Sequence, residues 1–324
     1  MNVLMIGVDE TSIGGMLTVV NNYKNNKEFC EMTNLKYIAT VIRSNKLVKI
    51  KTFLCKIPEI ISTIRNDKID IVHVHMAERG SVFREGFVVL LANVMGCKTV
   101  IHMHGAAIED WYNKQFVLIK KLIANIFCAA DVMIVLGDNW LPFMRSVMVG
   151  HEEKIKVLHN AVYVEAENKA NANATDILFY GMLIKRLYGD NKEFDVLKKL
   201  KEYHLEERAS YEGWMTSEKR QTVFSNTLIN VLPSYNEGLP MTILESMGYG
   251  IPNISTNIAA IPEAITDGVN GFTIEPGDVD SLAEKMKSLI LHKDFSNNAY
   301  ETAKNEFSIK THFAQLMKIY EQIM

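Results

Sequence analysis

The stretch of sequence that decides the fold reads Ser-Tyr-Asn-Glu-Gly-Leu-Pro-Met-Thr-Ile-Leu-Glu-Ser-Met-Gly-Tyr-Gly at residues 234–250. An apolar run at residues 227–233 precedes it and has the composition of a buried strand. A short polar loop with Gly238 follows, and Pro240 stands where an apolar, helix-like segment begins, a position that proline favours. Glycines and a proline end that segment after residue 247. We therefore predict a strand, a tight loop and a helix N-terminus in direct succession.

The loop and the helix start suit an anionic, hydroxyl-bearing ligand. A helix N-terminus offers unpaired N–H groups and a partial positive charge, which favour a diphosphate, and Gly238 lets the backbone approach a ligand closely. Glu245, inside the helix, can accept two hydrogen bonds from vicinal hydroxyls such as those of a ribose, and Glu237, in the loop, can hold sugar hydroxyls. Two solvent-facing glutamates are an equally good interpretation of the isolated pair.

On both sides of this stretch, short runs rich in Val and Ile alternate with segments of helical spacing. The expected strands are residues 3–8, 37–41, 69–76, 98–104, 132–136, 155–159, 176–181, 209–213, 227–233, 251–256 and 271–274. The expected helices include residues 47–65, 116–129, 191–204, 217–225, 281–291 and 310–322. Runs that are apolar almost throughout are typical of a parallel sheet covered on both faces, so the alternation predicts doubly wound α/β domains.

The chain is long enough for two such domains. Residues 163–175 are polar and rich in Ala and Asn, which is typical of a linker. We place one domain at residues 1–162 and a second at residues 176–307, and we expect the helix at residues 308–324 to pack back toward the first domain.

The alternation breaks at one place. Only nine residues separate Gly181 from Asn191, whereas a crossover between neighbouring parallel strands needs about a dozen or more. A helix and most of a strand are therefore missing there, either by deletion or because the sequence omits residues. We favour an omission, because a deletion would leave an uncovered sheet face and an exposed strand edge.

Composition narrows the class of partner. The chain carries 35 Lys and Arg against 38 Asp and Glu, a net charge of −3 that argues against a dedicated nucleic-acid binder. Residues 1–162 have a net charge of +4 and the remainder −7. A mildly basic half suits a phosphate-bearing or membrane-surface partner, and ordinary solvated faces explain it equally well. Four scattered cysteines indicate free thiols in a reducing cytoplasm, and we expect neither a signal peptide nor a membrane-spanning helix.

Three motifs together carry a family resemblance. The first is the Glu-x7-Glu spacing of Glu237 and Glu245, with Gly-Leu-Pro inside it. The second is Ala-Ile-Pro-Glu-Ala-Ile at residues 260–265, and the third is Asp-Gly-Val-Asn-Gly-Phe at residues 267–272. In combination they resemble the retaining glycosyltransferases of group 1, which have the GT-B fold.

The resemblance spans nearly the whole chain. Residues 157–162 resemble the Pro-Asn-Gly-Val between the domains of that family, with Ala in place of Gly. Residues 71–81 and 100–105 most resemble members that build bacterial capsule or exopolysaccharide. The implied fold is GT-B: two Rossmann-like doubly wound domains that face each other across a cleft, an N-terminal one for the acceptor and a C-terminal one for the donor.

The resemblance implies a nucleoside-diphosphate sugar as the donor, with a UDP-sugar favoured, and a glycan or a lipid-linked acceptor. It implies neither a metal nor a cofactor beside that co-substrate. Glu245 would hold the ribose, and Glu237 would face the sugar or the departing phosphate. His104, at the end of a strand, would approach the transferred sugar. The remaining donor-side residues would be Gly14, Gly15, Gly213, Trp214, Met215, Gly238, Leu239 and Pro240.

Two departures from the family pattern bear on activity. The family places an Arg after the glycine that ends the first strand of the donor domain, and a Lys-Gly a few residues later, to contact the diphosphate. Here Met182 follows Gly181, and Lys185 and Arg186 are the basic residues that can substitute. A catalytically weak or inactive relative that acts as a binding or scaffold subunit therefore stands as the alternative function. A dinucleotide-dependent oxidoreductase is disfavoured, because Gly-x-Gly-x-x-Gly is absent after the first strand.

Two further features remain open at this stage. His73 and His75 alternate with valines, which predicts packing on one face of a strand. No carboxylate or cysteine in the sequence pattern completes a metal site with them. A basic run from Arg43 to Lys56, interleaved with apolar residues, suits an anionic membrane or a solvated helix equally. The expected location is therefore the cytoplasm, with peripheral attachment to the inner face of the plasma membrane as an extension.

Overall fold

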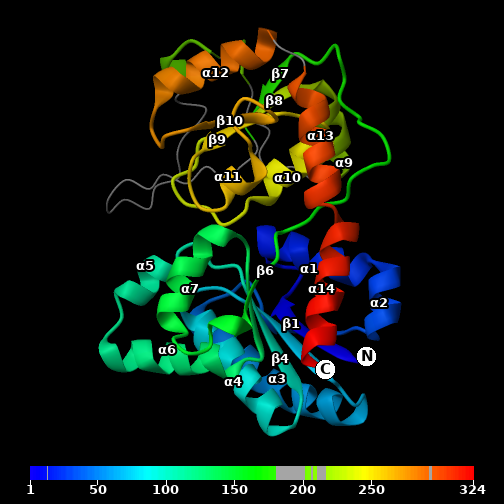
Figure 1. Cartoon of the computed structure of the whole chain (residues 1–324), viewed down its shortest axis with the longest axis vertical. Coiled ribbons are helices and arrows are strands. Elements are labelled where there is room, and N and C mark those ends of the chain that lie inside the picture. The colour runs from blue at the N-terminus through cyan, green and yellow to red at the C-terminus, as the bar shows by residue number, and fades with distance from the viewer. Residues whose placement is uncertain (13, 180–200, 206, 210–216, 292–293) are drawn as a thin grey trace.

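The computed structural model describes residues 1–12, 14–179, 201–205, 207–209, 217–291 and 294–324, and its chain forms two α/β domains (Figure 1). The N-terminal domain contains a six-stranded parallel sheet in the order β2-β1-β3-β4-β5-β6. Its strands are β1 (Val3–Val8), β2 (Lys36–Val41), β3 (Ile71–Met76), β4 (Lys98–Met103), β5 (Val132–Val135) and β6 (Ile155–Val157). Each lies within a range that the sequence predicts or overlaps it closely, so the prediction of a parallel α/β sheet is confirmed.

Helices cover both faces of this sheet. They are α1 (Gly15–Asn25), α2 (Lys27–Thr33), α3 (Lys46–Asn66), α4 (Gly80–Val94), α5 (Ile108–Asn113), α6 (Val117–Ala129) and α7 (Leu141–Val147). Asparagines cap the N-termini of α3 and α2. The side chain of Asn45 accepts a hydrogen bond from the Val48 amide, and that of Asn26 accepts one from the Phe29 amide. The central strands are buried throughout, which explains their apolar composition.

The C-terminal domain has a four-stranded parallel sheet in the order β10-β9-β8-β7 among the described residues. Its strands are β7 (Asp176–Leu178), β8 (Thr227–Leu232), β9 (Asn253–Thr256) and β10 (Gly271–Ile274). Its helices in the described residues are α9 (Ser217–Asn226), α10 (Met241–Gly248), α11 (Ile261–Ala264), α12 (Val279–Leu291) and α13 (Phe295–Glu306). The expected helix at residues 191–204 and strand at residues 209–213 fall mostly outside the described residues, as does the short segment from 181 to 191.

The chain passes between the two domains twice, and the two passages are bonded to each other. The Val162 amide donates to the Phe307 carbonyl at 2.9 Å, and the Ile309 amide donates to the Val162 carbonyl at 3.0 Å. Beyond the first passage, the carbonyl of Glu165 accepts a hydrogen bond from the hydroxyl of Tyr300 in α13. Further along, the side-chain amide of Asn168 donates to the hydroxyl of Ser296 and that of Asn171 donates to the Ser225 carbonyl, so residues 163–175 start at the junction and then lie against the C-terminal domain.

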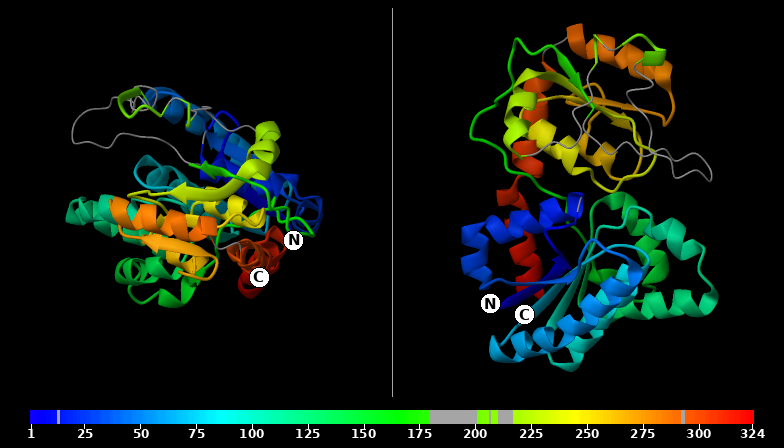
Figure 2. Two further views of the ribbon diagram at one scale, coloured as in Figure 1. Left: turned by 90° about the horizontal axis from the view of Figure 1, so that it is seen from above. Right: turned by 180° about the vertical axis from the view of Figure 1, so that it is seen from behind.

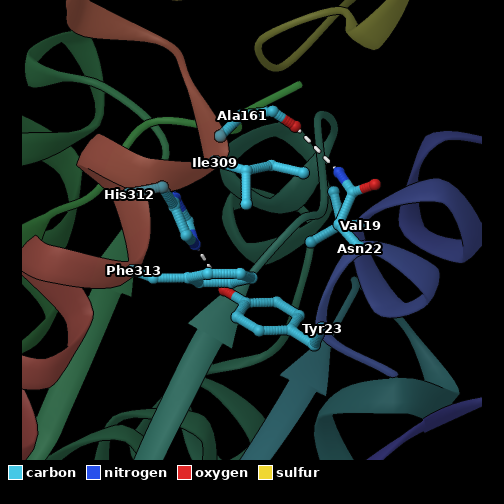
Figure 3. Close-up of a pocket in the computed structure, with 7 residues that line it drawn as sticks. All are labelled: Val19, Asn22, Tyr23, Ala161, Ile309, His312 and Phe313. Carbon is cyan, nitrogen blue, oxygen red and sulfur yellow. Dashed lines mark hydrogen bonds between the residues drawn. The ribbon is translucent and has the colours of Figure 1, made fainter. Parts of the chain in front are cut away.

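The last helix, α14 (Ile309–Ile323), lies on the N-terminal domain, and both chain termini lie near each other there (Figures 1 and 2). Its Phe313 stacks on Phe29 of α2, with 4.5 Å between ring centroids. The hydroxyl of Tyr23 in α1 meets Nε2 of His312 at 2.6 Å, beside a small cavity that Val19, Ile309 and Phe313 also line (Figure 3). Helix α14 is thus part of the core of the domain that the chain left about 150 residues earlier.

Burial of α14 predicts a large stability effect at Leu316, whose side chain is fully buried. We expect Leu316→Ala to lower the free energy of unfolding by about 2–5 kcal/mol, because it removes buried methyl groups and leaves a cavity. Gln315→Ala, one residue away on the exposed face, is the matched control and should change it by less than about 0.5 kcal/mol. Urea unfolding followed by tryptophan fluorescence measures both variants, and equal effects would contradict the packing described for α14.

Candidate functional site

The loop from Pro233 to Pro240 joins the buried strand β8 to the buried helix α10. Pro240 is the N-cap of α10 and Met241 is the first helical residue, so the helix begins one residue after the proline rather than at it. The helix carries no acidic residue in its first turn, and no side chain caps it. Its first backbone N–H groups therefore keep the partial positive charge that suits a phosphate.

Glu237 lies in this loop and is held by a neighbour. The hydroxyl of Ser234 donates to its Oε1 at 2.7 Å, and Thr256 of β9 in turn donates to the Ser234 carbonyl. Burial raises the pKa of the Glu237 carboxyl above its ordinary value, against the opposing effect of the Ser234 hydrogen bond. A half-buried carboxylate of this kind is a strong acceptor for a ligand hydroxyl, because little water competes for it.

Glu245 lies in the middle of α10, and only 8% of its side chain is exposed. Its Oε1 is 3.2 Å from Nη1 of Arg220, a residue of α9. A guanidinium at this distance forms a charge-assisted hydrogen bond with the carboxylate and fixes its orientation. Arg220 is not evident from the sequence, because α9 and α10 are separated along the chain by a whole strand and no local pattern links Arg220 to Glu245.

The same loop meets the N-terminal domain. A Cβ atom added to Gly15, the first residue of α1, would lie 3.5 Å from the side chain of Met241, and one added to Gly238 would lie 3.4 Å from Leu136 at the end of β5. Gly14 has a φ of 121°, a conformation that favours glycine, where it turns the chain into α1. Gly14, Gly15 and Gly238 therefore lie where the carboxyl end of the first sheet faces the start of α10.

The backbone of residues 238–240 is held from both domains. The side-chain amide of Asn160, at the junction, donates to the Leu239 carbonyl at 2.9 Å, and the Ala260 amide donates to the Gly238 carbonyl at 3.1 Å. Leu239 itself is buried. These bonds fix the loop before any ligand arrives, so its free N–H groups need little reorganisation to bind one.

The two downstream motifs have structural roles. Glu263 accepts hydrogen bonds from the backbone amides of Asp138 and Asn139 and pairs with Nε2 of His159 at 2.8 Å. Burial alone would raise the pKa of Glu263, but these hydrogen bonds outweigh it and leave the pKa below its ordinary value. The carboxylate therefore fastens the C-terminal domain to the ends of β5 and β6.

The third motif forms a tight turn before β10. Asp267 accepts a hydrogen bond from the Thr273 amide, and Gly268 has a φ of 74°. A Cβ on Gly271 would lie 2.4 Å from the Asn253 carbonyl, so only glycine lets β10 approach β9. This motif shapes the sheet beside the site and places no side chain in it.

His104 follows β4 directly, at the carboxyl end of the N-terminal sheet, where α/β sheets bind ligands. Its Nε2 lies 2.8 Å from Nδ1 of His75. Burial, and then the nearby His312, lower the pKa of His104 to about 3, so the imidazole is neutral at physiological pH. A neutral ring with Nε2 engaged leaves Nδ1 as the atom that can bond a ligand.

Comparison with known proteins identifies the family. Residues 146–306 match the family described as Glycosyl transferases group 1. A glycosyltransferase of Methanocaldococcus jannaschii is 30% identical over 284 residues, which cover 80% of this chain and 77% of the relative. The chain belongs to the group 1 glycosyltransferases.

Other relatives of this glycosyltransferase are similar along most of their length. A 41.2 kDa protein of the cps region of Klebsiella pneumoniae is 25% identical over 368 residues, covering 100% of this chain and 99% of the relative. The UDP-Gal:α-D-GlcNAc-diphosphoundecaprenol α-1,3-galactosyltransferase of Escherichia coli is 24% identical over 330 residues, covering 88% and 82%.

Solved structures show the fold. HepE of Anabaena, in complex with UDP, has a TM-score of 0.75 at 15% identity and covers 99% of this chain and 100% of its own. Sucrose-phosphate synthase of Thermosynechococcus elongatus has a TM-score of 0.77 at 12% identity, with 99% of both chains covered. The two doubly wound domains are a GT-B fold, as the sequence predicts.

Five candidate donor-side residues lie outside the described part of the structure: Lys185, Arg186, Gly213, Trp214 and Met215. The missing strand-helix unit expected near them stays a prediction. The alignment with the Klebsiella protein has 368 positions for a chain of 324 residues. That relative therefore has residues opposite gaps in this chain.

The raised pKa of Glu237 predicts that this residue destabilises the folded protein. The folded state binds its proton more tightly than the unfolded state, so stability falls as pH rises from the ordinary value of 4.5 through the folded pKa. We expect Glu237→Gln, which keeps an acceptor for Ser234, to melt at a higher temperature than the wild type at about pH 7.5 and at the same temperature near pH 4. The exposed Glu301→Gln is the control for the charge change. A lower melting temperature for Glu237→Gln at neutral pH would contradict the desolvation of Glu237.

Proposed function

We propose that this glycosyltransferase moves a sugar, with retention of configuration, from a nucleoside-diphosphate sugar to a glycan or lipid-linked acceptor in bacterial surface polysaccharide synthesis. The acceptor oxygen replaces the diphosphate oxygen on the anomeric carbon, and the acceptor proton leaves with the diphosphate. The observation that carries the proposal is Glu245, a nearly buried carboxylate paired with Arg220 behind the open N-terminus of α10.

This arrangement suits each part of the donor. The uncapped start of α10 stabilises the diphosphate, whose negative charge grows as the sugar–phosphate bond breaks. Glu245 accepts hydrogen bonds from two hydroxyls of a ribose, and Arg220 fixes the orientation of its carboxylate. Glu237, beside the same helix start, accepts a hydroxyl of the sugar, and His104 approaches that sugar from the other domain through Nδ1. No metal or further cofactor contacts the donor in this scheme.

A UDP-sugar is the favoured donor. The name of the Escherichia coli relative specifies UDP-Gal, and HepE was solved with UDP. The surface-polysaccharide role is supported by the Klebsiella relative, which belongs to a cps region, and by the lipid-linked acceptor in the name of the Escherichia coli enzyme. The scaffold alternative has no observation in its favour among the described residues, since Glu237 and Glu245 are both held in place.

We expect Glu245→Ala to abolish detectable donor binding, because a carboxylate set for two hydroxyls is replaced by a methyl group, and each hydrogen bond to a charged group contributes about 1.5–3 kcal/mol. A thermal-shift panel of UDP-, GDP- and ADP-sugars first identifies the donor, since a ligand at about 100 times its Kd adds about 2.7 kcal/mol. Titration calorimetry with that donor then compares the wild type, Glu245→Ala and the exposed control Glu301→Ala. Unchanged donor affinity in a folded Glu245→Ala protein would contradict the assignment of Glu245 to the ribose. Retention is tested separately, by NMR of the anomeric configuration of the product.

We further propose that α3 attaches the protein to an anionic membrane. The first half of α3 exposes its apolar side chains: Leu47 is 80% exposed, and Ile50 and Leu54 are each 57% exposed. Lys46, Lys49 and Lys51 lie among them. The second half of α3 is an ordinary surface helix, because its apolar residues Ile60 and Ile64 are buried in the core. The exposed apolar residues of the first half have no such packing partner and suit a membrane surface.

Among the described residues, no helix is long and apolar enough to cross a bilayer. Attachment through α3 therefore rests on a surface contact, in which each Lys contributes roughly 1 kcal/mol.

Charge reversal tests this surface. We expect the triple change Lys46→Glu, Lys49→Glu and Lys51→Glu to weaken co-sedimentation with phosphatidylserine vesicles by at least about tenfold and to leave turnover of a soluble acceptor unchanged. Three exposed lysines of the C-terminal half, Lys169, Lys201 and Lys287, changed in the same way, are the control for net charge. Vesicle binding that is insensitive to salt, or equal in the two triple variants, would show that α3 is a solvated helix.

A further inference from the structure

Four histidines lie on one face of the two central strands of the N-terminal sheet. His73 and His75 belong to β3, His102 belongs to β4 with His104 directly after it, and His75 is paired in register with His102. His73, His75 and His102 are almost completely buried. The sequence analysis predicts packing histidines here, but the register brings His102 to the same place as the other two.

Buried ring nitrogens without partners set this group apart from packing residues. Nε2 of His73, Nε2 of His75 and both ring nitrogens of His102 are buried and have no hydrogen-bond partner. A buried polar atom left unsatisfied costs about 1–3 kcal/mol. Four such atoms in one place indicate that a species absent from the protein chain satisfies them.

The partnered nitrogens show which atoms are left for that species. Nδ1 of His73 lies 2.6 Å from the hydroxyl of Tyr320 in α14, and Nδ1 of His75 lies 2.8 Å from Nε2 of His104. Both histidines thus have Nδ1 engaged and Nε2 free. Histidines that ligate a metal have this arrangement, because the outer N–H donates to a neighbour that fixes the ring.

We propose that His73, His75 and His102 bind a transition-metal cation, through Nε2 of the first two and one ring nitrogen of the third. One ligand atom from each residue lies within 4.8 Å of the others. Zn–N bonds of about 2.0–2.1 Å put the nitrogens of a tetrahedral site roughly 3.4 Å apart. The rings of His73 and His75 are inclined by only 27°, so both must turn toward the metal when it binds.

The donor set selects the class of metal. The group that the described residues form consists of imidazoles alone, which suit zinc, cobalt, nickel and copper rather than the oxygen-seeking magnesium and calcium. The site therefore differs in chemistry from one that would neutralise a donor diphosphate. Its depth in the sheet indicates a positioning role rather than a Lewis acid at the transferred sugar.

Metal binding would also set the protonation of His104. A metal on Nε2 of His75 requires the ring proton on Nδ1, and that proton is donated to Nε2 of His104. The proton of His104 is then on Nδ1, which makes this atom a hydrogen-bond donor. The hydrogen bond between Nδ1 of His73 and the hydroxyl of Tyr320 connects the proposed site to α14.

Metal content of the tag-free protein tests the proposal without using activity. We expect about one zinc ion per chain by mass spectrometry after dialysis, and a tetrahedral d–d spectrum when cobalt replaces it. His102→Phe and His73→Gln should each lower zinc affinity by more than about 100-fold, and Tyr320→Phe by about 10–100-fold. The exposed His204→Phe is the matched control and should bind zinc like the wild type.

Thermal shifts keep the test decisive if one ligand variant folds poorly. Zinc added back to chelator-treated protein should raise the melting temperature of the wild type, Tyr320→Phe and His204→Phe, in line with their affinities, and should leave that of His73→Gln unchanged. A wild-type protein without bound metal and without a zinc-dependent shift would overturn the proposal and assign the unsatisfied nitrogens to water. Equal zinc uptake by His102→Phe and the wild type would overturn it as well. Neither result would affect the proposed donor binding by Glu245 and the start of α10, and only the protonation assigned to His104 would change.

Discussion

The hydrogen bonds between the two passages at Val162 are the constraint on which the rest of the molecule depends. Because Val162 is bonded to both Phe307 and Ile309, the start of the second domain and its end are fixed at one point. Helix α14 therefore starts at the junction and packs on the first domain, where its Phe313 stacks on Phe29 in the core. It also places Asn160 against the carbonyl of Leu239, so the ligand loop is positioned from the junction itself.

The site is consequently shared between the domains. Glu263 bonds to backbone amides at the end of β5, while Leu136 of the same strand end contacts Gly238. Each contact is small, but all of them join the carboxyl edge of one sheet to the helix start that follows β8. A donor bound at α10 would thus be within reach of groups at the ends of β1 and β4, and changes in the angle between the domains would alter that reach.

The sequence predicts most of this fold because its signals are local. Apolar runs such as residues 3–8 are buried on both sides, and the glycines and proline around Glu237 mark a loop whatever lies opposite. Pairings that are distant along the chain escape such signals. Arg220 pairs with Glu245 only after α9 and α10 pack, and Leu47 is exposed because only the second half of α3, with Ile60 and Ile64, is buried. Pattern alone could equally have placed that side chain in the core.

The three buried histidines of β3 and β4 show most clearly that local patterns do not reveal distant pairings. Alternation in β3 predicts that His73 and His75 share a face, but a one-residue change in the pairing with β4 would turn His102 to the other side of the sheet. A core that served stability alone would have apolar residues at these positions, because each unsatisfied nitrogen opposes folding. Imidazoles on the two central strands, with Tyr320 and His104 bonded to two of their nitrogens, therefore fit the proposed metal, which would satisfy the nitrogens left without partners. Since His104 ends that row at the edge of the sheet, the occupant acts on the same side chain that faces the transferred sugar in the proposed reaction.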